Sequence, residues 1–139
     1  MTKKITESVN VKKLAIEAIL DKKGNEVVSL DLTKIKDTVS EYLIIAHGDS
    51  STHVRSLCDY VEDEIAKQGV RPYRVEGAKN GEWIIIDYVD VTVHIFYRDK
   101  RDFYALEDLW SDAKLTKHSD VEPKAPKVTR VTKKVKEIQ

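Results

Sequence analysis

The sequence has little of what unusual folds need: one cysteine, three prolines and five glycines among 139 residues. A single thiol cannot form an internal disulfide, and so little proline and glycine excludes collagen-like and low-complexity chains. No run approaches the ~18 consecutive apolar residues of a membrane helix, and no apolar core follows Lys3 and Lys4 as it would in a secretory signal. We therefore expect a cytoplasmic protein without a membrane segment. Cys58 falls in a helical apolar pattern, which predicts a buried side chain.

The chain also lacks a net charge, because 24 basic side chains balance 24 acidic ones. The two signs are unevenly distributed, however. Residues 112–139 hold eight Lys or Arg and four Asp or Glu, which leaves 16 basic and 20 acidic side chains in residues 1–111. An acidic body is a poor match for nucleic acid, since Lys and Arg contacts to phosphate dominate such binding. The charge distribution favours a basic protein as partner.

The length suits one domain. We assign residues 1–112 to this domain and residues 113–139 to a basic, flexible C-terminal tail. The tail contains Pro123 and Pro126 and has little apolar surface to bury, which is typical of a mobile extension.

The first half of the domain predicts a helix, two strands and a second helix. Apolar side chains recur at helical spacing over residues 11–19, and Gly24 is placed to form a left-handed cap. Alternation over residues 28–32 predicts an edge strand, and the apolar run 42–46 predicts a central strand covered on both faces. Helical spacing returns over residues 54–65.

The second half predicts three strands and a short helix. Residues 73–76 form a strand, and the strand–helix–strand crossover that leads to it makes it parallel to the central strand. Residues 83–86 and 91–96 form two antiparallel strands joined by a tight turn at Asp87–Asp90. A short helix capped by Asp102 ends the pattern. The order α-β-β-α-β-β-β-α indicates an α+β fold, a mixed β-sheet flanked by helices.

Motifs for metal binding and catalysis are scarce. The four histidines lack the spacing of a zinc site, and the chain has no Gly-x-Ser-x-Gly, Walker or Gly-x-Gly-x-x-Gly sequence. The sequence therefore predicts no metal and no cofactor.

One segment does resemble part of an enzyme site. Gly48-Asp49-Ser50 lies between a buried strand and a helix, where backbone N–H groups can receive a phosphate. Nucleotidyltransferases use a Gly-Ser there, and they need two carboxylates one residue apart on the next strand to hold a divalent ion. This chain has Arg74-Val75-Glu76 at that place, so a cation replaces one carboxylate. The simpler interpretation is a glycine turn followed by Ser50 or Ser51 as helix N-cap.

Polar and aromatic side chains gather on the predicted hairpin and on the helix after it. Acids at a hairpin are often only a solvated turn, and the two tryptophans are then part of the core. Aromatic side chains beside acids also describe a protein-binding face, because aromatic anchors with a charged rim dominate such interfaces. The residues that we predict for a partner-binding face are Trp83, Asp87, Tyr88, Asp90, His94, Tyr104, Glu107 and Trp110.

Two segments of the chain are similar to the signature of the ribosomal silencing factor family, RsfS or Iojap. Residues 81–96 read GEWIIIDYVDVTVHIF, and residues 101–110 read RDFYALEDLW. The resemblance includes the Gly48-x-Ser50 turn and covers roughly residues 8–112. Glu41 and Val89 are departures, since the family often has Asp and Gly at these positions.

The resemblance implies a nucleotidyltransferase-like core without its metal pair, and a function that is not enzymatic. The protein is expected to bind the large ribosomal subunit through ribosomal protein uL14, on the face that meets the small subunit. It would thereby block subunit joining and repress translation under nutrient limitation. A homodimer and a weak contact between the tail and ribosomal RNA are further expectations. A degenerate nucleotidyltransferase-like enzyme and a generic protein-binding adaptor are the alternatives.

Overall fold

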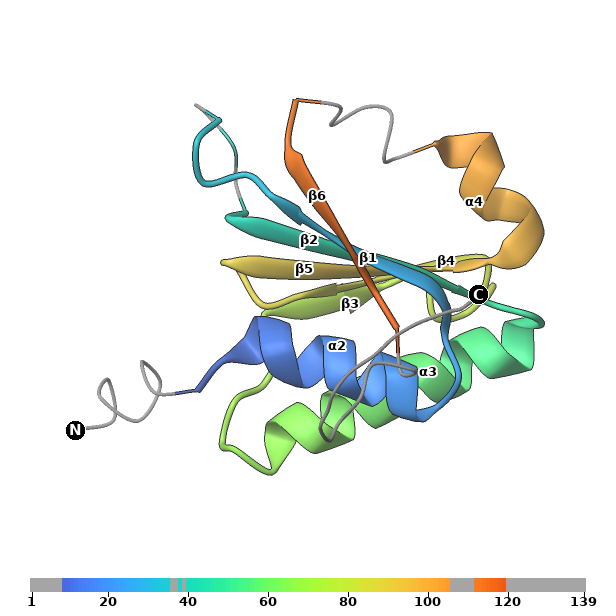
Figure 1. The fold of residues 1–139 in the computed structure, drawn as a ribbon. Helices are drawn as coiled ribbons and strands as arrows, with labels where there is room; N and C mark the ends of the chain where they lie inside the picture. The colour runs from blue at the N-terminus through green and yellow to red at the C-terminus, as the bar shows by residue number, and fades with distance from the viewer. Residues whose placement is uncertain (1–8, 36–37, 39, 106–111, 120–139) are drawn as a thin grey trace, which may run out of the picture.

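The computed structural model describes residues 9–35, 38, 40–105 and 112–119. These residues form three helices and six strands (Figure 1). The helices are α2 (Val11–Asp21), α3 (Ser51–Ala66) and α4 (Arg98–Tyr104); the strands are β1 (Asn25–Asp31), β2 (Tyr42–Gly48), β3 (Arg74–Glu76), β4 (Trp83–Asp87), β5 (Val91–Tyr97) and β6 (Lys114–His118). The predicted α+β class is confirmed.

The two long helices begin where a side chain caps their free N–H groups. The Asn10 side chain accepts a hydrogen bond from the backbone N–H of Lys13 at the start of α2, and Ser50 accepts one from His53 at the start of α3. Ser50 is therefore the N-cap, as the simpler interpretation of this turn predicted.

The end of α2 differs from the prediction. Lys23, and not Gly24, has the left-handed backbone, with φ of 66°. Gly24 is required for a different reason: a Cβ atom at this position would lie 2.2 Å from Cγ2 of Ile19. The glycine thus allows the chain to pass close to the helix as it turns into β1.

The six strands form one sheet in the order β3-β4-β5-β2-β1-β6. Strands β2 and β5 are parallel, with Ile44 opposite Val93, and every other neighbouring pair is antiparallel. Residues 42–46 therefore lie in a central strand, and β4 and β5 form an antiparallel hairpin, as predicted.

Strand β1 is not the edge strand that its alternating pattern predicted. Strand β6 pairs with it along its outer side, with Leu115 opposite Leu30. Residues 114–118 were expected to belong to a flexible tail, so the prediction of a tail beginning at residue 113 is wrong for this segment. A charged sequence such as Lys-Leu-Thr-Lys-His suits an edge strand, because an edge needs little apolar surface and lysines discourage pairing with other chains.

Strand β3 runs in the same direction as β2, as the crossover argument predicted, but the two are not neighbours. Strands β4 and β5 lie between them, and β3 pairs with β4 at the edge of the sheet. Helix α4 begins at Arg98, before the expected cap Asp102, and ends at Tyr104; the backbone of the following Ala105 is left-handed, with φ of 46°. The remainder of the predicted last helix, residues 106–110, lies outside the described residues.

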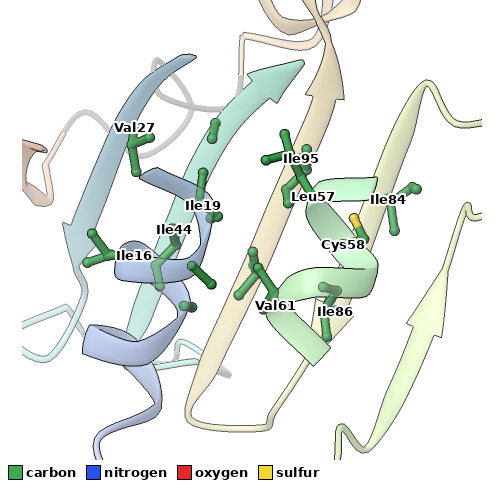
Figure 2. Close-up of a cluster of buried hydrophobic side chains, with 14 of the residues drawn as sticks. Ile16, Ile19, Val27, Ile44, Leu57, Cys58, Val61, Ile84, Ile86 and Ile95 are labelled. Carbon is green, nitrogen blue, oxygen red and sulfur yellow. The ribbon is translucent and has the colours of Figure 1, made fainter. Parts of the chain in front are cut away.

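Helices α2 and α3 lie side by side on one face of the sheet, and α4 lies on the other side, next to the end of β5 (Figure 1). Figure 2 shows the main core between the two long helices and the sheet, where Ile19 and Leu57 meet Ile44 and Ile95. Cys58 is buried in this core, as predicted. A smaller cluster on the opposite face includes Phe96. Burial of these side chains supplies the main force that holds the layers together.

Among the described residues, no helix is long and apolar enough to cross a membrane.

Candidate binding site on the β4–β5 hairpin

The register of the hairpin decides which side chains share a face. Trp83 lies opposite Phe96, and Asp87 lies opposite Thr92. Because side chains alternate along a strand, Trp83 and Asp87 point to the face away from α2 and α3, whereas Ile84 is buried beneath these helices.

Trp83, His94 and Phe96 form one contact group on that outer face. The indole Nε1–H of Trp83 donates a hydrogen bond to Nδ1 of His94 at 3.1 Å, and the Trp83 and Phe96 rings stack with centroids 5.0 Å apart. Since Nδ1 accepts this bond, the neutral imidazole carries its proton on Nε2. Burial lowers the pKa of His94 to about 4, against an opposing effect of the Asp87 carboxylate. The result is a half-buried Trp83 held in one orientation by a neutral histidine.

The turn at the other end of β4 is held by the side chain of Asp87 and the backbone of Asp90. Oδ1 of Asp87 accepts a hydrogen bond from the Val89 N–H at 2.7 Å, and its Oδ2 lies 3.5 Å from Nε of Arg74. The exposed Asp90 uses its carbonyl oxygen to accept a hydrogen bond from Glu41 N at 2.8 Å. The turn is therefore tied to both neighbouring strands, β3 and β2.

Tyr88 and His94 are the two predicted contact residues that the structure places among the buried side chains, and His94 is only 8% exposed. Tyr88 lies on a different face from the other predicted residues of the hairpin. Its side chain is only 9% exposed and belongs to the core beneath the helices, on the face opposite Trp83. The Tyr88 hydroxyl has no hydrogen-bond partner among the described residues, and burial, followed by the charge of Glu62, raises its pKa. The signal was present in the sequence: residues 84, 86 and 88 have the same parity, so Tyr88 continues the buried side of β4.

The predicted residues extend along the hairpin. Trp83 lies opposite Phe96, and Asp87 lies at the other end of β4, ~13 Å away at ~3.3 Å per residue. His94 lies opposite Ile85, between these two positions, where the Asp87 carboxylate acts on its pKa. The side chain of Tyr104, as well as Glu107 and Trp110, lies outside what the structure describes.

Arg101 is a structural residue that the sequence analysis missed. Its buried guanidinium reaches from α4 to the ends of β1 and β2, where Nη1 lies 2.7 Å from the Glu26 carbonyl oxygen and 3.0 Å from Nδ1 of His47. Burial, and then the charge of Arg101, lowers the pKa of His47. Arg101 thus fastens α4 to the sheet close to Trp83.

The segment that resembles a nucleotidyltransferase loop has ordinary structural contacts. Asp49 accepts a hydrogen bond from the Asn25 side chain at 3.2 Å and pairs with Arg98 at 3.5 Å. Arg74 lies 3.2 Å from a Glu76 carboxylate oxygen and, on its other side, contacts Asp87. In the part of the chain that the structure describes, no group of three or more His, Cys, Asp or Glu side chains could hold a metal ion.

These features define an α+β domain with a mixed sheet, two helices on one face, and a rigid hairpin that presents acidic and aromatic groups on the other. Comparison with known proteins gives the family. The family model described as "Ribosomal silencing factor during starvation" matches residues 5–138. The match extends beyond residue 112, where we expected the resemblance to end.

Curated proteins and solved structures agree with this match. The chain is 34% identical over 106 residues to the ribosomal silencing factor RsfS of Bacillus subtilis, covering 76% of this chain and 89% of that protein. A crystal structure of a Chromobacterium violaceum protein superposes with a TM-score of 0.70 at 38% identity, covering 73% of this chain and 83% of the other. A mouse protein named for mitochondrial assembly of the ribosomal large subunit is 27% identical over 75 residues, which is 52% of this chain and 33% of that protein. The chain belongs to the ribosomal silencing factor family.

Proposed function

We propose that this protein binds the large ribosomal subunit through ribosomal protein uL14 and sterically blocks joining with the small subunit. The observation that carries the proposal is family membership over residues 5–138. The name of the mouse relative, which refers to the large subunit, supports the choice of subunit. Repression of translation in nutrient limitation, in the cytoplasm where ribosomes work, completes the proposed role.

The hairpin is the proposed contact surface. Trp83 is oriented by His94, and the Asp87–Asp90 turn is tied to its neighbours, so little conformational freedom is lost when a partner binds. The exposed Asp90 at this turn suits the Lys and Arg side chains of a basic ribosomal protein. Tyr104, Glu107 and Trp110 remain proposed contacts from the adjoining segment. Tyr88 is assigned to the core instead.

Subunit joining tests the proposal directly. Purified protein added to separated subunits should reduce the joined-particle peak in a density gradient and should migrate with the large subunit. An unchanged peak at saturating protein would contradict it. Asp90→Ala should weaken binding while the circular dichroism spectrum stays as in the unmodified protein. Glu17→Ala, which removes an exposed acid from α2, is the matched control and should bind normally.

A degenerate nucleotidyltransferase is the alternative function, and we propose that the protein lacks this activity. Arg74 lies between the carboxylates of Glu76 and Asp87, where a divalent ion would require two unneutralised acids. Labelled nucleotides with magnesium or manganese should therefore give no labelled product. Nucleotide transfer by the unmodified protein that disappears in Glu76→Gln would instead support the enzymatic alternative.

Two further parts of the proposal concern assembly and the C-terminus. A homodimer is proposed and is tested by light scattering at several concentrations. The domain is proposed to end after β6, near residue 119, and the remaining basic segment to add a weak contact with ribosomal RNA. Truncation after His118 should then reduce large-subunit binding by no more than a few fold, and a hundredfold loss would show that the segment carries the main contact.

A further inference from the structure

Helix α4 has seven residues, too few for a helix to be stable without contacts to the rest of the fold. It lies against β5 and β2, next to the end of β5 (Figure 1). Among the side chains of α4 that the structure describes, Arg98 and Asp99 are exposed and Arg101 is buried, with 5% exposure. Arg98 pairs with Asp49 at 3.5 Å, but both side chains are more than half exposed, so this ion pair holds the helix weakly. Of the described contacts of α4, that of Arg101 is therefore the strongest.

The start of β1 is shaped to accept the Arg101 guanidinium. The register between β1 and β2 shifts between Asn25 and Val28, and Glu26 in this bulge has a φ of 46°. Two carbonyl oxygens of the bulge approach Nη1 of Arg101, that of Asn25 at 3.4 Å and that of Glu26 at 2.7 Å. His47 of β2 adds its Nδ1, 3.0 Å from the same nitrogen. These three acceptors are the Arg101 receptor. A positive φ outside glycine is strained and persists only where the surrounding contacts hold it.

The Arg101 receptor is itself fixed in place. The side-chain amide of Asn25 donates to the His47 carbonyl oxygen at 3.3 Å and to Oδ1 of Asp49 at 3.2 Å. Because Nδ1 of His47 accepts from Arg101, the imidazole carries its proton on Nε2. Burial, and then the charge of Arg101, lowers the pKa of His47 against the opposing carboxylates of Glu26 and Asp49. The ring is therefore a neutral acceptor at neutral pH.

The Arg101 contact lies beside the proposed contact surface. Tyr97 is the residue before α4, and its backbone N–H donates to the Glu82 carbonyl oxygen at 2.9 Å. Because Glu82 precedes Trp83, α4 starts next to the aromatic end of the hairpin. Tyr104, a proposed contact, is the last residue of α4 and follows Arg101 by less than one helical turn. The contact of Arg101 therefore fixes where this part of the chain lies relative to Trp83.

We propose that Arg101 is a positioning residue for docking on the large subunit: seated in its receptor, it holds α4 beside Trp83, so that helix and hairpin meet the partner as one preformed surface. The inference rests on the proposed function and adds to it a residue that acts through others instead of touching the partner. Without this contact, α4 can leave the sheet and has to be ordered when the partner binds. The cost of that ordering lowers the affinity.

Affinity measured at comparable stability separates positioning from a purely structural role. Cosedimentation of the full chain with purified large subunits is carried out at a temperature where circular dichroism shows every variant to be folded. Arg101→Met should then lower affinity at least ~10-fold. Val61→Ala, which truncates a fully buried side chain of α3, is the matched control. It should also lower the melting temperature, yet bind within ~3-fold of the unmodified chain.

Two further variants examine the charge. Arg71→Met removes a positive charge from an exposed position before β3 and should bind normally. Arg101→Lys keeps a charged donor that can reach the carbonyl oxygens of the bulge, and it should recover part of the affinity that Arg101→Met loses.

The receptor is tested from its other side by His47→Ala, which removes one acceptor and leaves Arg101 in place. Affinity should fall at least ~3-fold. His118→Ala is the matched control, because His118 bonds Ser29 at 2.9 Å on the face of the sheet opposite α4. It should bind normally.

The outcomes separate the two proposals. If the unmodified chain binds large subunits but Arg101→Met binds as tightly as Val61→Ala, the positioning role is refuted and the proposed function survives. If Arg101→Met does not fold, equal binding by His47→Ala and His118→Ala refutes the positioning role in the same way. If the unmodified chain does not bind large subunits, the proposed function and this inference are both refuted.

Discussion

Acidification should destabilise this protein through His94, and the size of the effect follows from its burial. The imidazole has a pKa of about 4 in the folded protein, against 6.5 for an unperturbed side chain. Above pH 6.5 both the folded and the unfolded state hold a neutral His94, so this group adds no pH dependence. As the pH falls below 6.5, the unfolded chain takes up a proton that the folded protein excludes, and the free energy of unfolding decreases.

The expected slope is ~1.4 kcal/mol per pH unit between pH 6.5 and 4. Lowering the pH from 7.5 to 5.0 crosses about 1.5 units of this window, which corresponds to a loss of ~2 kcal/mol from His94 alone. Such a loss is a large part of the stability of a small domain, which is typically ~5–15 kcal/mol.

His94→Gln isolates this contribution. Glutamine has no titrating group, and its side-chain oxygen can accept the hydrogen bond from Trp83 Nε1 that His94 Nδ1 accepts at 3.1 Å. Urea unfolding of both proteins, followed by far-ultraviolet circular dichroism, gives the free energy of unfolding at each pH. The difference between the two curves cancels the contributions of His47 and His118, whose pKa values burial also lowers. We expect the difference between the free energies of unfolding of the two proteins to shrink by ~2 kcal/mol between pH 7.5 and 5.0. Parallel curves would refute the argument.

Three other substitutions have definite expected results. Tyr88→Phe should raise the free energy of unfolding by ~1 kcal/mol, because it removes a buried hydroxyl for which the described part of the chain offers no hydrogen-bond partner; a loss of stability in urea titrations would show that the hydroxyl is satisfied. Val89→Gly should also stabilise, by ~1 kcal/mol, since a β-branched residue with φ of 74° is strained and half of its side chain is exposed; an unchanged or lower melting temperature would contradict this. Arg101→Met should lower the free energy of unfolding by ~2–4 kcal/mol, because it leaves the Glu26 carbonyl oxygen and His47 without their buried donor. A decrease below ~0.5 kcal/mol would show that α4 does not depend on this contact.

The local elements were largely predictable because they depend on neighbouring residues. The periodicity of residues 11–19, the Ser50 cap and the Asp87–Asp90 turn each reflect contacts within a few positions of the chain. The contact between Trp83 and His94 was predictable as well, because a tight turn fixes the register of the two strands that it joins.

The candidate site was only partly predictable. Tyr88 was assigned to the surface because it lies between two acids, although the alternation of β4 continues through it into the core.

By itself, the amino-acid sequence determined the helices, the hairpin and the family, since these depend on short-range periodicity and on contiguous motifs. Only the tertiary structure decided that β6 covers β1, that β4 and β5 separate β3 from β2, and that Arg101 of α4 joins Glu26 and His47. Such pairings bring together segments dozens of residues apart. They are chosen by competition among all strand edges and buried polar groups for partners, and that competition leaves no periodic signal in any single segment.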